Sequence, residues 1–309
     1  MKLGIIGIGH IAQYHFEAIG LIDGLELTSV CDHDYSKLEN VKLDVDKYNN
    51  SNDLISSSQV DVVMIATPTE SHAKMAEHVI KAGKPVILEK PAALTFREFN
   101  LLKSLSLSKK VPVFTLFHAS YGYELTPTFE ILNNLENKDG LVWKSFFSDP
   151  YEKDAKAKSS LVNSWVDSGI NFLSILQRVL SPDSIDLIFS SHTPATGEEK
   201  SKICSNLVFE FSGNISGTAI IECNWSKGIN RKVSKVRIQN KHWLILEHSD
   251  QSLVELGRRM TIDNELPRLT NHYIAAFEEA KNFLSQGKSN WAFSEACHHP
   301  YWQGFKEVL

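Results

Sequence analysis

Short apolar runs alternate with helical patterns along the first third of the chain. Strands are predicted for the apolar runs at Lys2–Ile6, Leu25–Cys31, Asp61–Ala66, Pro85–Leu88 and Val111–Phe117. Apolar residues with helical spacing separate these runs, most clearly over 70–81 and 95–106. Because strands that alternate with helices pair in parallel, we predict that the chain begins with an α/β domain built on a doubly wound parallel sheet.

The pattern changes after about His118. Helices are predicted at 125–135 and 167–180 with a strand at 141–148 between them, and alternating strands follow from Ile185 to about Val254. Two more helices are predicted at 271–284 and 295–308. Successive strands form largely antiparallel sheets, which can leave one face open. We therefore predict a first domain at 1–118 and a second, α+β domain at 119–309 with a large, mostly antiparallel, open-faced sheet.

The first strand runs into a glycine-rich turn, Gly7-Ile8-Gly9-His10-Ile11-Ala12. Gly7 permits a tight turn, Gly9 removes a side chain where a pyrophosphate approaches, and Ala12 keeps the following helix close to the strand. The helix N-terminus adds N–H donors and the positive end of the helix dipole. This turn predicts a Rossmann-type dinucleotide site, with contacts from Gly7, Gly9, His10 and Ile11.

An acidic residue, Asp32, follows the second strand, 20 residues after Ala12. A carboxylate at this place accepts hydrogen bonds from the ribose hydroxyls and repels a 2′-phosphate. We therefore expect NAD as the cofactor. NADP is the alternative if His33 and the nearby lysines accommodate a phosphate.

The candidate functional residues of the first domain lie at the carboxyl ends of the predicted strands, where ligands of open α/β sheets bind. Besides the glycine turn and Asp32, this edge carries Thr67 and Pro68 after the third strand and Glu89 and Lys90 after the fourth. We predict that these residues contact the cofactor. Lys90 is expected to lie where the nicotinamide ring would be held.

Charge, apolar content and cysteine spacing limit which partners and which cellular location can be expected. The chain has 309 residues, a net charge of −5 and no basic cluster, which argues against binding to nucleic acid or to anionic membrane surfaces. It contains no apolar stretch long enough to span a membrane. The four cysteines lack paired spacing, so we expect a reducing, cytoplasmic location. No metal is expected, because Cys297-His298-His299 lacks a second pair of ligands.

Four strings of the first domain resemble the glucose–fructose oxidoreductase and inositol dehydrogenase family (Gfo/Idh/MocA). They are the glycine turn, the run from Asp61 to Pro68, His72, and the run from Ala82 to Pro91. The resemblance implies a two-domain dehydrogenase in which His72 contributes to the cofactor site and Lys90 is catalytic. The family's second motif, Asp-x-x-x-His, matches Asp167 to Asn171, with asparagine at the histidine position.

Within this family, the string from Asp167 to Leu176 is similar to the L-arabinose and D-galactose 1-dehydrogenases. Phe117-His118 and Asn224-Trp225 share this similarity. Those enzymes oxidise the anomeric carbon of an aldopyranose to a lactone. The resemblance implies sugar contacts from His118, Asn171 and two aromatic platforms, Trp165 and Trp225. The alternative is a structural role, in which both tryptophans pack in the core and His118 is a hydrogen-bonded core histidine.

The asparagine at 171 bears on the reaction. Asp167 and Asn171 are spaced for one helix face, which could meet Lys90 across a cleft between the domains. Oxidising a hydroxyl requires a group that accepts the proton, and asparagine cannot titrate, so the task falls to Asp167 or Lys90. An anomeric hydroxyl is more acidic than that of an inositol, so a carboxylate base suits it better. Asp167 as a helix cap, and Asn171 as a partner of a backbone group, remain alternatives.

These observations favour an NAD(P)-dependent sugar dehydrogenase acting at C1 of an aldopyranose. An inositol or polyol dehydrogenase of the same family is one alternative, and a non-catalytic dinucleotide-binding sensor is another. The open sheet of the second domain predicts a homodimer or homotetramer formed through that face.

Overall fold

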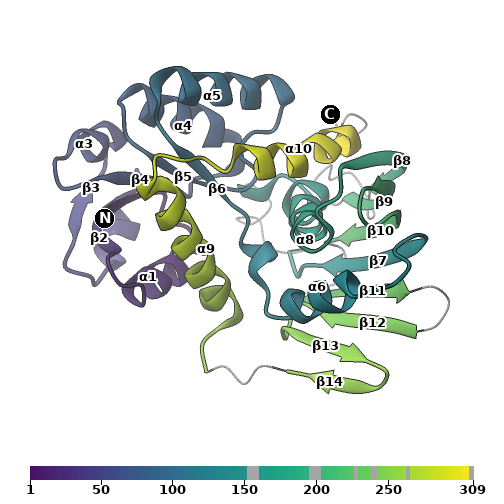
Figure 1. The fold of residues 1–309 in the computed structure, drawn as a ribbon. Helices are drawn as coiled ribbons and strands as arrows, with labels where there is room; N and C mark the ends of the chain where they lie inside the picture. The colour runs from purple at the N-terminus through teal and green to yellow at the C-terminus, as the bar shows by residue number, and fades with distance from the viewer. Residues whose placement is uncertain (152–159, 195–202, 226–228, 239–241, 262–264, 306–309) are drawn as a thin grey trace. The chain divides into compact units, whose positions relative to one another are not determined.

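The chain forms two compact units in the computed structural model, which describes residues 1–151, 160–194, 203–225, 229–238, 242–261 and 265–305 (Figure 1). The first unit comprises residues 1–118 and 269–294, and the second comprises 119–268 and 295–309. No helix in these described ranges is both long and apolar enough to cross a membrane.

The first unit is built on a six-stranded parallel sheet with the order β3-β2-β1-β4-β5-β6. Its central strands are buried along nearly their whole length, which fits a sheet covered on both faces. The strands are β1 (Lys2–Ile6), β2 (Glu26–Cys31), β3 (Asp46–Tyr48), β4 (Val62–Ile65), β5 (Val86–Glu89) and β6 (Val113–Leu116).

Helices cover both faces of this sheet, with α4 and α5 on one side and α1 and α9 on the other (Figure 1). A capping box between Thr95 and Glu98 fixes the start of α5. The helical elements of the unit are α1 (Ala12–Gly20), α2 (Tyr35–Asn40), α3 (Ser51–Ser56), η1 (Thr69–Ser71), α4 (His72–Lys81), α5 (Phe96–Lys109) and α9 (Arg268–Ser285). The predicted α/β fold with a parallel sheet is confirmed, although 35–56 contains three short elements that the apolar pattern does not show.

Helix α9 joins the first unit, whereas the sequence assigned all of 119–309 to the second domain. The Tyr273 ring packs edge-on against His15 of α1, with ring centroids 4.4 Å apart. Farther along, the Asn290 side chain hydrogen-bonds both the N–H and the carbonyl of Thr115 in β6, each at 2.8 Å. This docking joins residues far apart in the chain, so local patterns carry no sign of it.

The second unit contains an eight-stranded sheet with the order β14-β13-β12-β11-β7-β10-β9-β8. Among the described strands of this sheet, only β7 and β10 pair in parallel, so the predicted mostly antiparallel sheet is confirmed. Its strands are β7 (Leu141–Ser148), β8 (Ser184–Pro194), β9 (Ile203–Ser212), β10 (Gly217–Asn224), β11 (Arg231–Ile238), β12 (His242–Glu247), β13 (Ser252–Glu255) and β14 (Arg258–Met260).

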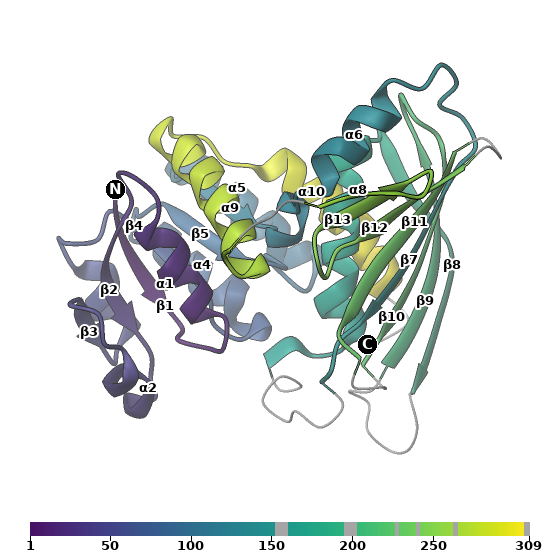
Figure 2. The same ribbon diagram turned by 90° about the horizontal axis from the view of Figure 1, so that it is seen from below.

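One face of this sheet is packed against helices, and in the described chain no helix of this unit lies on the other face (Figure 2). The packed face includes Phe209 of β9, whose ring stacks on Trp165 at 6.2 Å. The covering elements are α6 (Leu125–Asn133), η3 (Trp165–Gly169), α8 (Ile170–Leu180) and the second half of α10 (Trp291–Phe305), and η2 (His118–Tyr121) precedes α6.

The long helix predicted from Asp167 begins differently. Residues Trp165–Gly169 form a π-helical turn, called the π-turn below, and regular α-helix starts at Ile170. A π-turn inserts an extra residue into the helical repeat. The apolar spacing of the sequence does not reveal such an insertion.

Candidate functional site

Gly7 forms a turn that only glycine fits. Its φ is +99°, and a Cβ at this position would lie 2.6 Å from the Ala66 carbonyl oxygen. The Gly7 N–H donates to the carbonyl of Cys31 at 2.8 Å. The turn is therefore held against the carboxyl ends of both neighbouring strands, β2 and β4.

The next part of the turn leaves open space at the start of α1. A Cβ at Gly9 would meet no heavy atom within 4 Å, and Gly9 and His10 are exposed. The helix begins after Ile11, where no side-chain hydrogen bond caps it. Backbone donors beside open space suit an anionic group such as a pyrophosphate. The residues therefore fit the predicted dinucleotide.

Asp32 is tied to the glycine turn. Its Oδ2 accepts hydrogen bonds from the Ile8 N–H at 2.8 Å and from the Lys37 ammonium at 2.9 Å. Its Oδ1 accepts from the Asp34 N–H at 3.0 Å and lies 3.4 Å from Nδ1 of His33. Burial alone would raise the pKa of Asp32, but the N–H groups of Asp34 and Ile8, together with Lys37, hold it below its usual value. The carboxylate thus shapes the turn as well as being available to a ribose.

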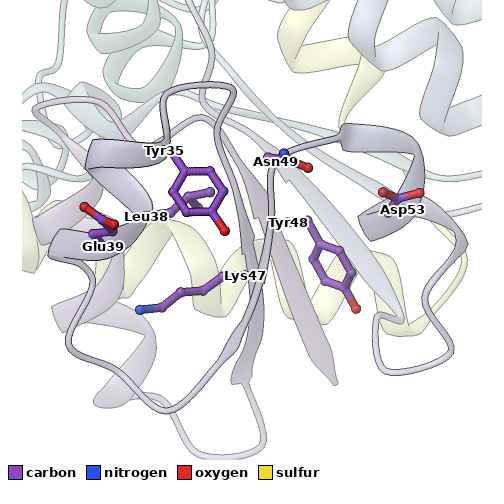
Figure 3. Close-up of a pocket in the computed structure, with 7 residues that line it drawn as sticks. All are labelled: Tyr35, Leu38, Glu39, Lys47, Tyr48, Asn49 and Asp53. Atoms are coloured by element: carbon purple, nitrogen blue, oxygen red, sulfur yellow. The ribbon is translucent and has the colours of Figure 1, made fainter.

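A hollow of about 320 Å³ lies beside this edge of the sheet. In Figure 3, Tyr35 of α2 and Tyr48 of β3 contribute aromatic rings to it. The hollow is lined by Tyr35, Leu38, Glu39, Lys47, Tyr48, Asn49 and Asp53, so none of the predicted cofactor residues lines it.

His72 ties together the two loops that carry Thr67-Pro68 and Lys90-Pro91. Its Nδ1 lies 2.8 Å from the Pro91 carbonyl oxygen, and its Nε2 lies 2.8 Å from that of Thr67. Burial lowers the pKa of this imidazole. Because both nitrogens face the main chain, His72 acts in the structure by holding the loops.

Glu89 lies at the centre of a buried network next to Lys90. Its Oε1 accepts the Tyr273 hydroxyl at 2.8 Å and lies 3.1 Å from Nε2 of His15, and its Oε2 accepts the Lys90 N–H at 3.2 Å. Burial alone would raise the pKa of Glu89, but contacts with His15, Lys90 and Tyr273 hold it below its usual value. Glu89 therefore supports the main chain at Lys90. The sequence showed no sign of His15 or Tyr273 in this role.

His118, at the start of η2, is 9% exposed in the first unit. Its ring stacks on His272 at 5.9 Å and is tilted against Tyr273 at 5.4 Å. Tyr273 thus contacts both His118 and the network around Glu89. A sugar contact from His118 remains a prediction.

In the second unit, Asp167 lies in the π-turn and is half-buried. It is not the residue that caps this helix, since the N-cap residue is Ser164. The Asn163 side chain accepts the Val166 N–H at 2.9 Å. Asn171 follows in α8 and is only 4% exposed. Within the described ranges, its Oδ1 accepts no hydrogen bond. A buried acceptor without a donor suits the predicted contact with a ligand hydroxyl.

The two predicted aromatic platforms are both fully buried. Trp165 is sandwiched between Phe209 and Tyr301, and its indole N–H donates to the Tyr301 carbonyl at 3.3 Å. Trp165 is therefore a core residue, and the prediction of a sugar platform at this position is wrong. Trp225 packs edge-on against Tyr151 at 5.5 Å, so its ring is not an exposed platform either.

The structure gathers the predicted cofactor residues in the first unit, and it places Asp167 and Asn171 in the second. Among the described side chains, no three His, Cys, Asp or Glu residues are grouped as a metal site requires.

Comparison with known proteins identifies the first unit. Residues 1–117 match the family model described as "Oxidoreductase family, NAD-binding Rossmann fold" (GFO_IDH_MocA). This part of the chain is therefore similar to the Gfo/Idh/MocA family. Within it, 100 residues are 35% identical to an inositol 2-dehydrogenase of Salmonella paratyphi B. That stretch covers 31% of this chain and only 30% of the relative's length.

Solved structures extend the likeness in fold to the whole chain. A D-galactose-1-dehydrogenase from Rhizobium etli superposes with a TM-score of 0.78 at 18% identity, covering 98% of this chain and 94% of its own. A myo-inositol 2-dehydrogenase from Lactobacillus plantarum has the same TM-score and identity, covering 100% and 97%. The first 117 residues thus match the Gfo/Idh/MocA family model, and the whole chain shares its fold with these two solved structures.

Proposed function

We propose that this protein is an NAD(P)-dependent dehydrogenase that oxidises a hydroxyl of a sugar or polyol. The observation that carries the proposal is the arrangement at the carboxyl edge of the first sheet. There, the open glycine turn is bonded to Asp32, and Lys90 follows Glu89 at the end of β5. Such a site combines an anion-binding turn, a ribose acceptor and a lysine on one rigid sheet.

The cofactor would be held by the turn from Gly7 to Ile11 at its phosphates and by Asp32 at its ribose. When bound, it supplies a nicotinamide ring that accepts hydride. Thr67 and Pro68 border the same edge, and His72 keeps their loop against the one that carries Lys90. We propose that the enzyme is cytoplasmic, because its cysteines lack the paired spacing of a disulfide framework.

The proposed proton chemistry uses Lys90 and Asp167. Lys90 stabilises charge that develops on the substrate oxygen, and Asp167 accepts the proton, directly or through Lys90. Asn171 offers its Oδ1, which accepts no hydrogen bond from the part of the chain that the structure describes, to a second hydroxyl of the substrate. We propose further that Lys90, Asp167 and Asn171 act on the same substrate molecule.

The finer proposal is oxidation at C1 of an arabinose- or galactose-like aldopyranose, which gives a lactone. It rests on Asn171, because a site without a titrating histidine suits the more acidic anomeric hydroxyl. The alternative within the family is an inositol or polyol dehydrogenase, which the 35% identity with an inositol 2-dehydrogenase over 100 residues supports.

The proposal is tested by following nicotinamide reduction with a panel of aldoses and inositols, using NAD and NADP in parallel. We expect rapid turnover with one aldopyranose. Turnover confined to inositols would favour the alternative. Binding of NAD without turnover of any sugar in the panel would favour a dinucleotide-binding sensor. Asn171, which cannot titrate, is also compatible with that hypothesis.

Asp32→Ala is expected to alter cofactor choice. The variant loses the ribose acceptor and the bond that orders the glycine turn, so kcat/KM with NAD should fall about tenfold or more. The ratio of NADP to NAD efficiency should rise, because the carboxylate that repels a 2′-phosphate is gone. Steady-state kinetics with both cofactors measure this ratio. Lys37→Ala is the matched control, and it should lower NADP efficiency, since it removes the ammonium beside Asp32.

We propose that the uncovered face of the second sheet joins two or four copies of the chain. Cross-strand neighbours form mixed rows there, one of which contains Ile245, Lys235, Lys144, Ile220 and Val208. The next row contains Trp243, which is 41% exposed, and reaches Glu210 of β9 and Asp186 of β8 at its other end. Cations thus lie toward β11 and β7, and acids toward β9. A two-fold axis would bring the cationic side of one copy against the acidic side of the other.

Substituting Ile220→Glu in the middle of this face is expected to dissociate the oligomer. The added charge would be buried against apolar side chains of the second copy, where burial is costly. Light scattering on a sizing column should show two or four times the single-chain mass for the parent protein and the single-chain mass for the variant. Leu107→Glu, on an exposed position of α5, is the control and should leave the mass unchanged. A parent protein of single-chain mass would refute the interface.

A further inference from the structure

The second unit holds a buried charged cluster that takes no part in the proposed reaction. Asp149 directly follows β7, Lys232 lies in β11 and Ser168 lies in the π-turn, so three separate elements meet there. The Lys232 ammonium forms an ion pair with Oδ1 of Asp149. The Ser168 hydroxyl donates a hydrogen bond of 2.8 Å to Oδ2. Both carboxylate oxygens of Asp149 are therefore engaged by the protein.

Water has little access to this cluster. Asp149 is 4% exposed, Ser168 is fully buried, and the side chain of Lys232 is 13% exposed. Moving opposite charges out of water is costly, and a buried ion pair often adds no stability over an apolar pair of the same size. The pair is thus better explained by the geometry that it fixes than by a gain in stability.

The geometry in question is that of the π-turn. Such turns are rare and recur at functional sites. On one side of Asp167, the Asn163 side chain holds the Val166 N–H. On the other side, the next residue, Ser168, is held by Asp149. Side chains outside the turn therefore anchor it on both sides of Asp167.

We propose that Asp149 and Lys232 are positioning residues that set the orientation of Asp167 through Ser168. The inference rests on the proposed function, in which Asp167 accepts the substrate proton. Lys232 acts one step away, since its ammonium keeps the Asp149 carboxylate in place to accept the Ser168 hydroxyl. Without Lys232, the buried carboxylate would lose the ammonium that pairs with its Oδ1, and it could turn away from the Ser168 hydroxyl.

The test uses the full chain with the substitutions Lys232→Met and Ser168→Ala. Arg231→Met is the matched control, because Arg231 precedes Lys232 in β11 but pairs with Glu247 rather than with Asp149, and its side chain is 55% exposed. Two quantities are measured for each variant. One is amide hydrogen exchange in peptides that cover 163–171, and the other is kcat and KM with NAD and D-galactose, L-arabinose or myo-inositol as probes.

We expect Lys232→Met and Ser168→Ala to lower kcat by about 10- to 100-fold with little change in KM, because a misplaced base slows the reaction without removing substrate contacts. Exchange should accelerate in 163–171 and remain unchanged in the strands of the first unit. Arg231→Met should behave like the parent protein in both measurements.

Three results would overturn the inference: unchanged exchange at 163–171, an unchanged kcat in an active protein, or faster exchange throughout the second unit, which would indicate a general loss of stability. If the parent protein oxidises none of the three probes, the proposed function fails on that panel, and the exchange data alone decide whether the pair holds the turn. If Lys232→Met does not fold, Ser168→Ala decides, because it removes one hydroxyl and no charge.

Discussion

Lys90→Ala should reduce kcat/KM by about 10²- to 10⁴-fold, the range expected when a group that assists proton transfer is removed. Affinity for NAD should change little, because the glycine turn and Asp32 belong to other loops of the sheet. Lys90→Arg is expected to fail almost as badly. It keeps a positive charge, but a guanidinium does not release its proton near neutral pH. Steady-state kinetics together with a titration of NAD measure the two effects separately.

Lys81→Ala provides the control for this prediction. Lys81 ends α4 in the same unit, and its side chain is 58% exposed and paired with Glu77. The control should retain full activity. A Lys90→Ala protein that binds NAD and still turns over sugar at the parent rate would remove Lys90 from the mechanism.

Gly7→Ala and Gly9→Ala are expected to give opposite results. At Gly7, a methyl group would strain a φ of +99° and meet the Ala66 carbonyl oxygen at 2.6 Å, so the free energy of unfolding should fall by about 2–4 kcal/mol. At Gly9, a methyl group meets nothing within 4 Å, so stability should change by less than about 0.5 kcal/mol. The dissociation constant for NAD should nevertheless rise about tenfold or more with Gly9→Ala, because the methyl group occupies space needed by the pyrophosphate.

Urea unfolding and calorimetric titration of NAD distinguish the two glycines. Each variant is the control for the other, since both add one methyl group to the same turn. Equal loss of stability in both would mean that the turn tolerates no side chain anywhere. Undiminished NAD affinity in Gly9→Ala would place the cofactor elsewhere.

Local signals in the sequence were sufficient for the main strands of the first unit and for the run of strands in the second. Parallel strands such as β4 are short apolar runs followed by turn residues, and a glycine turn between a strand and a helix is readable from the chain alone. Asp32 was found by its distance from that turn. These features depend on residues close together in sequence, where spacing carries structural information.

Contacts between distant segments were not readable in the same way. Tyr273 donates to Glu89 across 184 residues, and the pairing of Lys232 with Asp149 joins strands 83 residues apart. The choice between a sugar platform and a packing role for Trp165 could not be made from the sequence, because an indole that covers a sugar and one that fills a core look the same there. Only packing reveals which of the two a given tryptophan is.

The return of α9 to the first unit has a consequence for synthesis on the ribosome. Residues 269–294 emerge only after the whole of 119–268 has been made. Until then, Glu89 lacks the Tyr273 hydroxyl, and His15 lacks the ring that packs against it. The first unit therefore cannot complete its fold while the second unit is being translated. During that time, one face of its sheet lacks the cover that α9 provides. A fragment that ends near residue 118 would remain in that unfinished state, which makes it a natural client for chaperones.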